Sequence, residues 1–186
     1  MNIYALSSGR GPSGIAILRL SGNSVKNVVN RITKNKILNY KEVNFCKFYN
    51  PIDNSILDEG ILLLFNKPNS FTGEDLAEFH IHGSNAVINS FLKVLSFQNN
   101  CRLAEPGEFT KIAFQNNKID LLKAESIGDL ITSETEIQRQ QAIKLIQGNA
   151  SNYYNDLREK LIKSLAYIEA KIDFAEDDLP DKVLKQ

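Results

Sequence analysis

Three polar side chains alternate with apolar ones between residues 75 and 82. Glu78, His80 and His82 occupy every second position. The residues that alternate with them are apolar: Ala77, Phe79 and Ile81. In a β-strand, this alternation places the polar side chains on one face and the apolar side chains on the other. We therefore expect a strand whose polar face could hold a ligand.

Two chemistries and one structural role fit this face. Because histidines at positions i and i+2 can converge on one ion, Glu78, His80 and His82 could form the three-ligand metal site of a hydrolase. Alternatively, the Glu78 carboxylate could accept two parallel hydrogen bonds from an amidine-like N–C–NH2 edge, such as that of guanine or a pterin. The same face could also pair across a dimer interface in a purely structural assembly domain.

A second candidate residue is Arg19, which ends the apolar segment 14–20. Strand alternation places it on the same face as Ile15 and Ile17, where a guanidinium needs an anionic partner. An internal ion pair and a bound anion both satisfy that need. The preceding Gly9-Arg10-Gly11-Pro12-Ser13-Gly14 segment could be a simple turn or a close approach to a ligand, but it is not a P-loop, because no Gly-Lys-Ser/Thr occurs in the chain.

A third candidate is Lys118. Pro106-Gly107 predicts a turn followed by a short helix, and Asn116-Asn117 can adopt the left-handed conformation before Asp120. Lys118 lies at this hinge. From its residue type and position alone, Lys118 is interpreted as a solvated loop lysine.

These residues require a mixed α+β framework. Strands are expected at 2–6, 14–20, 42–48, 60–65 and 75–82. Two helices are expected between them, one after the Ser21-Gly22-Asn23 cap and the other after Ser84. The interleaving predicts a mixed sheet with helices packed on it, in a domain spanning 1–118.

From 119 to 186 the pattern is helical only. Asp120 is placed to cap a helix that could extend to Gly148, and a second helix should follow. Its apolar residues form a narrow stripe: Tyr154, Leu157, Leu161, Leu165, Ile168 and Ile172. With no further partner for this stripe, the region is interpreted as the start of a truncated helical domain.

Composition restricts the possible functions. Twenty-two basic residues balance twenty-two acidic ones, so any nucleic-acid contact must come from a local patch or from missing parts. Cys46 and Cys101 fit neither a metal motif nor a disulfide framework, which favours a reducing compartment. No run approaches the roughly 18 apolar residues of a membrane helix, and no signal peptide is apparent, so we expect a soluble, cytoplasmic protein with no membrane association.

Taken together, the motifs resemble, in order and spacing, the tRNA-modification GTPase family MnmE/TrmE over about Ile3 to Pro180. They are Gly9-Arg10-Gly11, Leu18-Arg19-Leu20-Ser21-Gly22, Thr72-Gly73-Glu74-Asp75, Glu78, His82-Gly83, Pro106-Gly107-Glu108-Phe109, Ala113-Phe114, Asn116, Lys118, Asp120-Leu121, Ala124-Glu125 and Asp173-Phe174.

The resemblance implies an N-terminal domain similar to tetrahydrofolate-binding aminomethyltransferase domains. Such a domain forms a homodimer and binds a one-carbon carrier of the 5-formyltetrahydrofolate or 5,10-methylenetetrahydrofolate type. By the family pattern, the folate contacts fall on Arg19, Glu78 and Lys118. No catalytic residue and no metal site is implied for this part of the protein.

For the whole protein, the family implies a helical domain with an inserted GTPase domain that uses GTP, Mg2+ and K+. It acts with an FAD-containing partner, MnmG/GidA, on the wobble uridine of certain tRNAs, giving a 5-carboxymethylaminomethyl-type modification. The chain departs from the family pattern at Pro12-Ser13, Ser84 and Ile112, and it lacks both the P-loop and the C-terminal Cys-x-Gly-Lys. Alone, it is therefore expected neither to hydrolyse GTP nor to modify tRNA.

Overall fold

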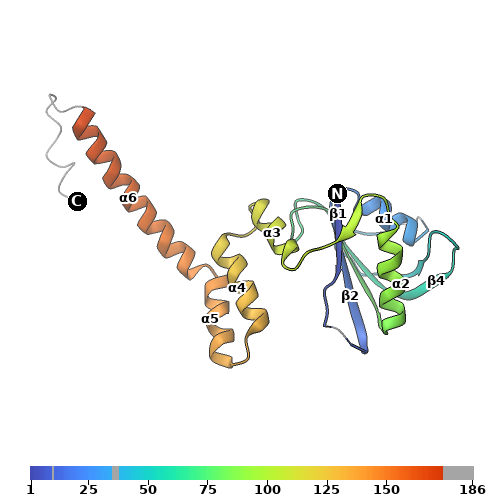
Figure 1. The fold of residues 1–186 in the computed structure, drawn as a ribbon. Coiled ribbons are helices and arrows are strands. Elements are labelled where there is room, and N and C mark those ends of the chain that lie inside the picture. The colour runs from blue at the N-terminus through green and yellow to red at the C-terminus, as the bar shows by residue number, and fades with distance from the viewer. Residues whose placement is uncertain (10, 35–37, 174–186) are drawn as a thin grey trace. The chain divides into compact units, whose positions relative to one another are not determined.

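A computed structural model describes residues 1–9, 11–34 and 38–173 of the chain (Figure 1). The chain forms two compact units, of which the first is Met1–Ile119 and the second begins at Asp120. Arg10, in the glycine-rich segment, and the stretch after Asp173 lie outside the described residues.

The first unit is built on a six-stranded sheet with the order β3-β4-β5-β2-β1-β6. The strands are β1 (Asn2–Leu6), β2 (Ser13–Ser21), β3 (Asn44–Tyr49), β4 (Ile56–Phe65), β5 (Leu76–Gly83) and β6 (Cys101–Leu103). All neighbours pair antiparallel except β1 and β6, which are parallel. The α+β class and the mixed sheet predicted from the sequence are confirmed.

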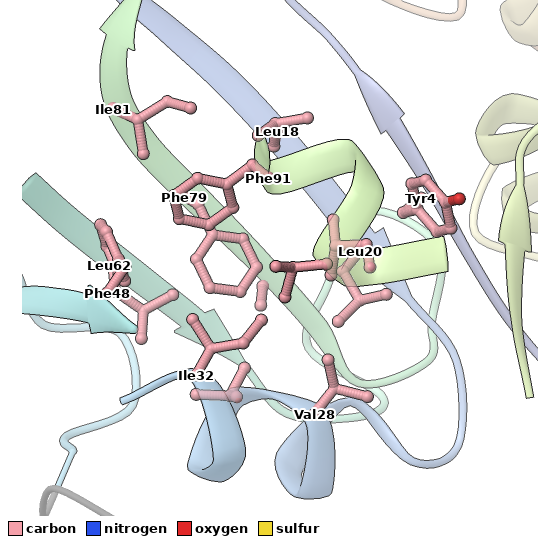
Figure 2. Close-up of a cluster of buried hydrophobic side chains, with 14 of the residues drawn as sticks. Tyr4, Leu18, Leu20, Val28, Ile32, Phe48, Leu62, Phe79, Ile81 and Phe91 are labelled. Atoms are coloured by element: carbon pink, nitrogen blue, oxygen red, sulfur yellow. The ribbon is translucent and has the colours of Figure 1, made fainter. Parts of the chain in front are cut away.

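Two helices, α1 (Val25–Ile32) and α2 (Asn85–Ser96), cover one face of this sheet. Val28 and Ile32 of α1 point into the core beside Leu20, and Phe91 of α2 lies over Phe79 (Figure 2). The rings of Phe48, Phe79 and Phe91 lie 5.3–5.6 Å apart between centroids, within the range of favourable aromatic pairs. The alternate residues of β2 and β5, including Arg19 and Glu78, therefore belong to the opposite face.

The beginning of α1 differs from the prediction. Its N-cap is Ser24, without a side-chain cap bond, whereas Ser21 belongs to β2 and bonds Thr72. The side chain of Asn2, fully buried in β1, accepts a hydrogen bond from the Ser24 backbone and donates one to the Ser24 hydroxyl. A contact between distant segments thus replaces the predicted local cap. The Ser84 cap of α2 is confirmed, since its hydroxyl accepts the backbone N–H of Val87.

The sequence patterns did not indicate β6, which has three residues and pairs in parallel with β1. A strand this short carries no alternation that could be recognised. Beyond β6, Gly107 adopts a φ of 75° and precedes α3 (Glu108–Gln115), and Asn117 has a φ of 54°. The predicted turn, short helix and left-handed asparagine are therefore all present.

In the second unit, Asp120 caps α4 (Leu121–Thr132) by accepting the N–H of Lys123, as predicted. The helix does not extend to Gly148, however. It stops at Thr132, and Thr135 begins α5 (Glu136–Ile146) with a capping box to Gln138. Because Thr135 and Gln138 satisfy the first amides of a new helix, they terminate what would otherwise be a continuous helical pattern. The last helix is α6 (Asn149–Asp173).

No helix among the described residues is long and apolar enough to cross a membrane. Cys46 is buried in the core, and Cys101 is half-buried in β6.

Candidate ligand site on the open face of the sheet

Arg19 and Glu78 lie directly opposite each other on neighbouring strands. The β2–β5 register pairs their Cα positions. Arg19 donates from Nε and Nη2 to the same carboxylate oxygen, Glu78 Oε1, at 2.9 and 2.7 Å. The side chains are 27% and 17% exposed, so the pair is shielded from water but reachable from the open face. The anionic partner that Arg19 requires is therefore Glu78.

The second oxygen of this carboxylate is not used in the same way. Within the described residues, Glu78 Oε2 accepts no hydrogen bond, and it lies 3.8 Å from His80 Nε2. His80 Nε2 is itself buried without a hydrogen-bond partner in this part of the chain. Buried polar atoms are rarely left without partners in native structures. An acceptor and a ring nitrogen that lie 3.8 Å apart, neither with a hydrogen-bond partner among the described residues, are therefore suited to a polar ligand.

Two aromatic rings flank the guanidinium. The Arg19 Cζ atom lies 5.6 Å from the ring centroids of both Phe71 and Phe109, within cation–π range. Phe71 comes from the loop between β4 and β5, and Phe109 from the first turn of α3. These rings provide apolar surface beside the polar pair. That combination is typical of small-molecule sites, where apolar walls surround a few polar groups that fix orientation.

Lys118 contacts the same β4–β5 loop that contributes Phe71. Its Nζ donates to the backbone carbonyl of Pro68 at 2.9 Å, and its aliphatic stem lies close to the backbone of Gly73. Gly73 has a φ of 78°, and a Cβ atom there would lie 3.2 Å from Lys118 Cγ. The lysine is therefore held against the loop by packing and by a hydrogen bond.

The β4–β5 loop is anchored at several points. The Thr72 hydroxyl is fully buried and lies 2.7 Å from that of Ser21, at the end of β2. The Thr72 carbonyl accepts a 2.7 Å bond from the side chain of Asn116, next to α3. Asp75 accepts the backbone N–H of Lys67 at the start of the loop. Because the loop is tied to both β2 and the end of α3, Phe71 and Lys118 have fixed positions relative to Arg19.

His82 does not join Glu78 and His80. Its ring Nδ1 lies 2.8 Å from Asp58 Oδ1, its backbone N–H donates to Asp58 Oδ2 at 2.7 Å, and its side chain is 71% exposed. Among the described residues, no group of three or more His, Cys, Asp and Glu side chains is arranged to hold a metal ion. The geometry thus gives no support to a metal-dependent hydrolase using Glu78, His80 and His82.

Sequence reasoning identified part of this arrangement. It placed Arg19 on the same face as Ile15 and Ile17, and Glu78 on the face opposite Ala77, Phe79 and Ile81, but it did not place the two in register with each other. It did not identify Phe71, Phe109 or Asp58 as neighbours of the candidate residues. Of these three, only the two phenylalanines could have been suspected from the sequence, because each lies next to a glycine-containing turn motif.

Comparison with known proteins agrees with the motif pattern. Residues 2–118 match the family described as GTP-binding protein TrmE N-terminus, and residues 121–186 match the MnmE helical domain. The chain belongs to the TrmE/MnmE family. These matches meet at the same place as the two structural units, between Ile119 and Asp120.

Several curated relatives are similar along the whole chain. The tRNA modification GTPase MnmE of Pelagibacter ubique (strain HTCC1062) is 58% identical over 186 residues, which cover 100% of this chain and 42% of the relative. MnmE of Parvibaculum lavamentivorans is 43% identical over 182 residues, 98% of this chain and 42% of the relative. The mitochondrial tRNA modification GTPase of Dictyostelium discoideum is 42% identical over 191 residues, 99% of this chain and 37% of that protein. The chain therefore spans about two fifths of the length of these relatives.

Proposed function

We propose that this chain is the N-terminal part of a GTPase that modifies the wobble uridine of tRNAs, and that the open face of its sheet binds a tetrahydrofolate one-carbon carrier. The observation that carries the folate proposal is the Arg19–Glu78 pair. Arg19 fixes one carboxylate oxygen, while Glu78 Oε2, on a side chain that is 17% exposed, accepts no hydrogen bond from the described residues.

The residues present fit a pterin. Its N–C–NH2 edge offers parallel donors to a carboxylate, and Glu78 is held in place by two hydrogen bonds from Arg19. The buried His80 Nε2, which lacks a partner in the described part of the chain, lies 3.8 Å from Glu78 Oε2 and could bond the same ring system. Phe71 and Phe109 supply apolar surface for a flat heterocycle.

The two cations would serve the carbonyl or anionic portions of the ligand. Arg19 is already engaged with Glu78. Within the described residues, Lys118 bonds only a backbone carbonyl, which an anionic group could replace. When bound, the folate would supply a one-carbon unit. The contribution of this chain is to bind and orient the carrier and to shield part of it from water.

The remaining functions are proposed for the full-length protein. The relatives are named tRNA modification GTPases, and we propose the same activity for the complete protein, with GTP, Mg2+ and K+ bound by a domain outside this chain. We also propose a cytoplasmic homodimer that acts on tRNA together with an FAD-containing partner of the MnmG/GidA type. The chain alone, without a P-loop, should not hydrolyse GTP.

The folate proposal can be tested by calorimetric titration of the chain with 5-formyltetrahydrofolate, comparing the wild type with Glu78→Gln. Glutamine keeps an oxygen for Arg19 but lacks the negative charge and the second acceptor. Since charge-assisted hydrogen bonds contribute roughly 1.5–3 kcal/mol each, affinity should fall by about ten- to a hundred-fold. The matched control is Glu59→Gln, an exposed glutamate on β4, which should bind like the wild type.

Two outcomes would contradict the proposal. Equal affinity of the Glu78→Gln and Glu59→Gln variants would remove Glu78 from the site. If Glu78→Gln instead altered the sedimentation behaviour of the chain while folate affinity stayed unchanged, the polar face would be an assembly surface. Circular dichroism of both variants provides the check that the fold is retained.

A further inference from the structure

The charges of this chain are unevenly distributed, although they sum to zero. Residues 25–49 contain six basic side chains and only one acidic side chain, Glu42. The basic residues are Lys26, Arg31, Lys34, Lys36, Lys41 and Lys47. Lys36 lies outside the described residues, and the other five are exposed. We refer to these five as the basic patch.

The patch lies on α1, on β3 and on the connection between them. Val28 and Ile32 point from α1 into the core (Figure 2), so the exposed Lys26 and Arg31 occupy the remaining surface of that helix. Lys47 is an outward residue of β3, between the buried Cys46 and Phe48. Three of the five members, Lys26, Arg31 and Lys47, therefore lie on two elements that contact each other, α1 and β3.

Nearby carboxylates offset the positive charge of the patch only in part. None of its five members forms an ion pair with a carboxylate in the described part of the chain. The nearest carboxylate along the ladder is that of Glu59, whose Cα pairs with that of Lys47. Position at the end of α1 would account for Lys34, because a cation there offsets the helix dipole. It does not account for Lys41 or Lys47, which lie outside the helix.

Aromatic rings lie directly beside two of these cations. The Nζ of Lys34 lies 3.9 Å from the ring centroid of Tyr49, and the Nζ of Lys26 lies 5.2 Å from that of Tyr40. Lys34, Lys47 and Tyr49 line a common hollow of about 380 Å³, together with Glu59. Proteins bind unpaired RNA with cations that contact the phosphate backbone and with neighbouring aromatic rings on which bases stack.

The spread of the cations favours an extended polyanion over a single phosphate. Lys26 lies in the first turn of α1 and Lys34 just after its end, so about 12 Å separates their backbones along the helix axis. We propose that the basic patch binds an RNA backbone, with Tyr40 and Tyr49 available to bases. The choice of RNA as the polyanion rests on the proposed function, whereas the surface is distinct from the folate site.

The test is fluorescence anisotropy with a labelled, unmodified tRNA transcript, using the chain and a Lys34→Gln/Lys47→Gln double variant over a series of salt concentrations. Each phosphate contact contributes about one to the slope of log affinity against log salt. The double variant should therefore bind about ten-fold more weakly and show a salt slope lower by about two. A second variant, Lys26→Gln/Arg31→Gln, should give the same direction of change if the first fails to fold.

The matched control is Lys160→Gln/Lys163→Gln, which removes the same charge from exposed positions on α6. Equal weakening by control and test variants would show attraction without a defined surface and would overturn the proposal. Tighter binding of a labelled polyglutamate peptide than of tRNA at the same salt would also overturn it, in favour of an acidic protein partner. Glu78→Gln should leave RNA binding unchanged, so failure here is distinguishable from failure of the folate proposal.

Discussion

At the scale of single residues, Asp58 has a role that its sequence position does not reveal. The β4–β5 ladder begins with Ile61 opposite His80, and before this point Asp58 bonds β5 through its side chain. Its carboxylate accepts a hydrogen bond from the backbone N–H of His82 and is hydrogen-bonded to the ring Nδ1 of the same residue. Burial alone would raise the pKa of the Asp58 carboxyl, but the hydrogen bonds from His82 and the backbone of Glu59 outweigh this effect and lower it.

A carboxyl whose pKa is lowered by folding stabilises the native state only while it is ionised. This contribution is complete above its unfolded-state pKa, near 4, and is lost as the pH falls through the lower folded-state value. We therefore predict that Asp58→Asn lowers the free energy of unfolding by roughly 1–2 kcal/mol at neutral pH, and by much less near pH 3. Urea denaturation followed by circular dichroism at both pH values measures the difference. Glu42→Gln, at an exposed position, is the control and should not lose stability in a pH-dependent way. If Asp58→Asn lost the same free energy of unfolding at both pH values, the prediction would be contradicted.

At the scale of secondary-structure elements, periodicity predicted most of the first unit. Strands β1 to β5 and helices α1 and α2 each carry an apolar pattern long enough to fix their type. Two features could not be found that way. The short strand β6 depends on pairing with β1, and the side chain of Asn2, 22 residues before Ser24, defines the start of α1. Both are tertiary contacts between segments far apart in sequence.

The candidate site shows the same division. Alternation along β5 was sufficient to assign Glu78 to the face opposite Phe79. Along β2, where both faces carry apolar residues, it grouped Arg19 with Ile15 and Ile17 without showing which face is the core. Their direct pairing depends on strand register, which alternation alone does not specify. The approach of Phe71 and Phe109 depends on how the β4–β5 loop and α3 fold back over that face, and the loop is fixed by bonds from Thr72 to Ser21 and Asn116. These side-chain contacts leave no periodic trace in the sequence.

The same elements predict where the unit is most sensitive to mutation. Phe79 of β5 is fully buried and contacts both Phe48 and Phe91, which joins the β3–β4 hairpin to α2. Phe79→Ala should lower the free energy of unfolding by about 3–5 kcal/mol, from lost burial and the cavity left behind. Phe97→Ala, at a 58% exposed position, should cost less than about 1 kcal/mol. Urea denaturation of both variants measures the two losses of unfolding free energy. Losses of similar size would show that the aromatic cluster is not central to stability.

At the scale of the whole molecule, the two faces of the sheet and the edge at α1 and β3 have separate tasks. The core face provides stability, the open face presents the polar pair of the candidate ligand site, and the edge concentrates positive charge that the zero net charge conceals. This separation allows the folate and RNA proposals to be tested independently. Substitutions at Glu78 and Lys47 affect different surfaces, so each should weaken the binding of its own ligand and leave the binding of the other unchanged.

The helix α6 differs from the rest of the described chain in how little of it is buried. Its apolar stripe was predicted from spacing, and each member is at least 42% exposed: Tyr154, Leu157, Leu161, Leu165, Ile168 and Ile172. Since tertiary packing supplies most helical stability in proteins, a helix of 25 residues with so little burial should open locally far more readily than α2, which buries four residues in the core.

We therefore predict that the backbone amides of α6 exchange with deuterium at least about ten-fold faster than those of α2 in this chain, as measured by mass spectrometry of exchanged peptides. Comparing dilute and concentrated protein provides the control, because self-association through the stripe would make protection depend on concentration. Slow exchange at high concentration only would mean that a second copy covers α6. Slow exchange at every concentration would contradict the prediction and show that α6 is stabilised within the single chain.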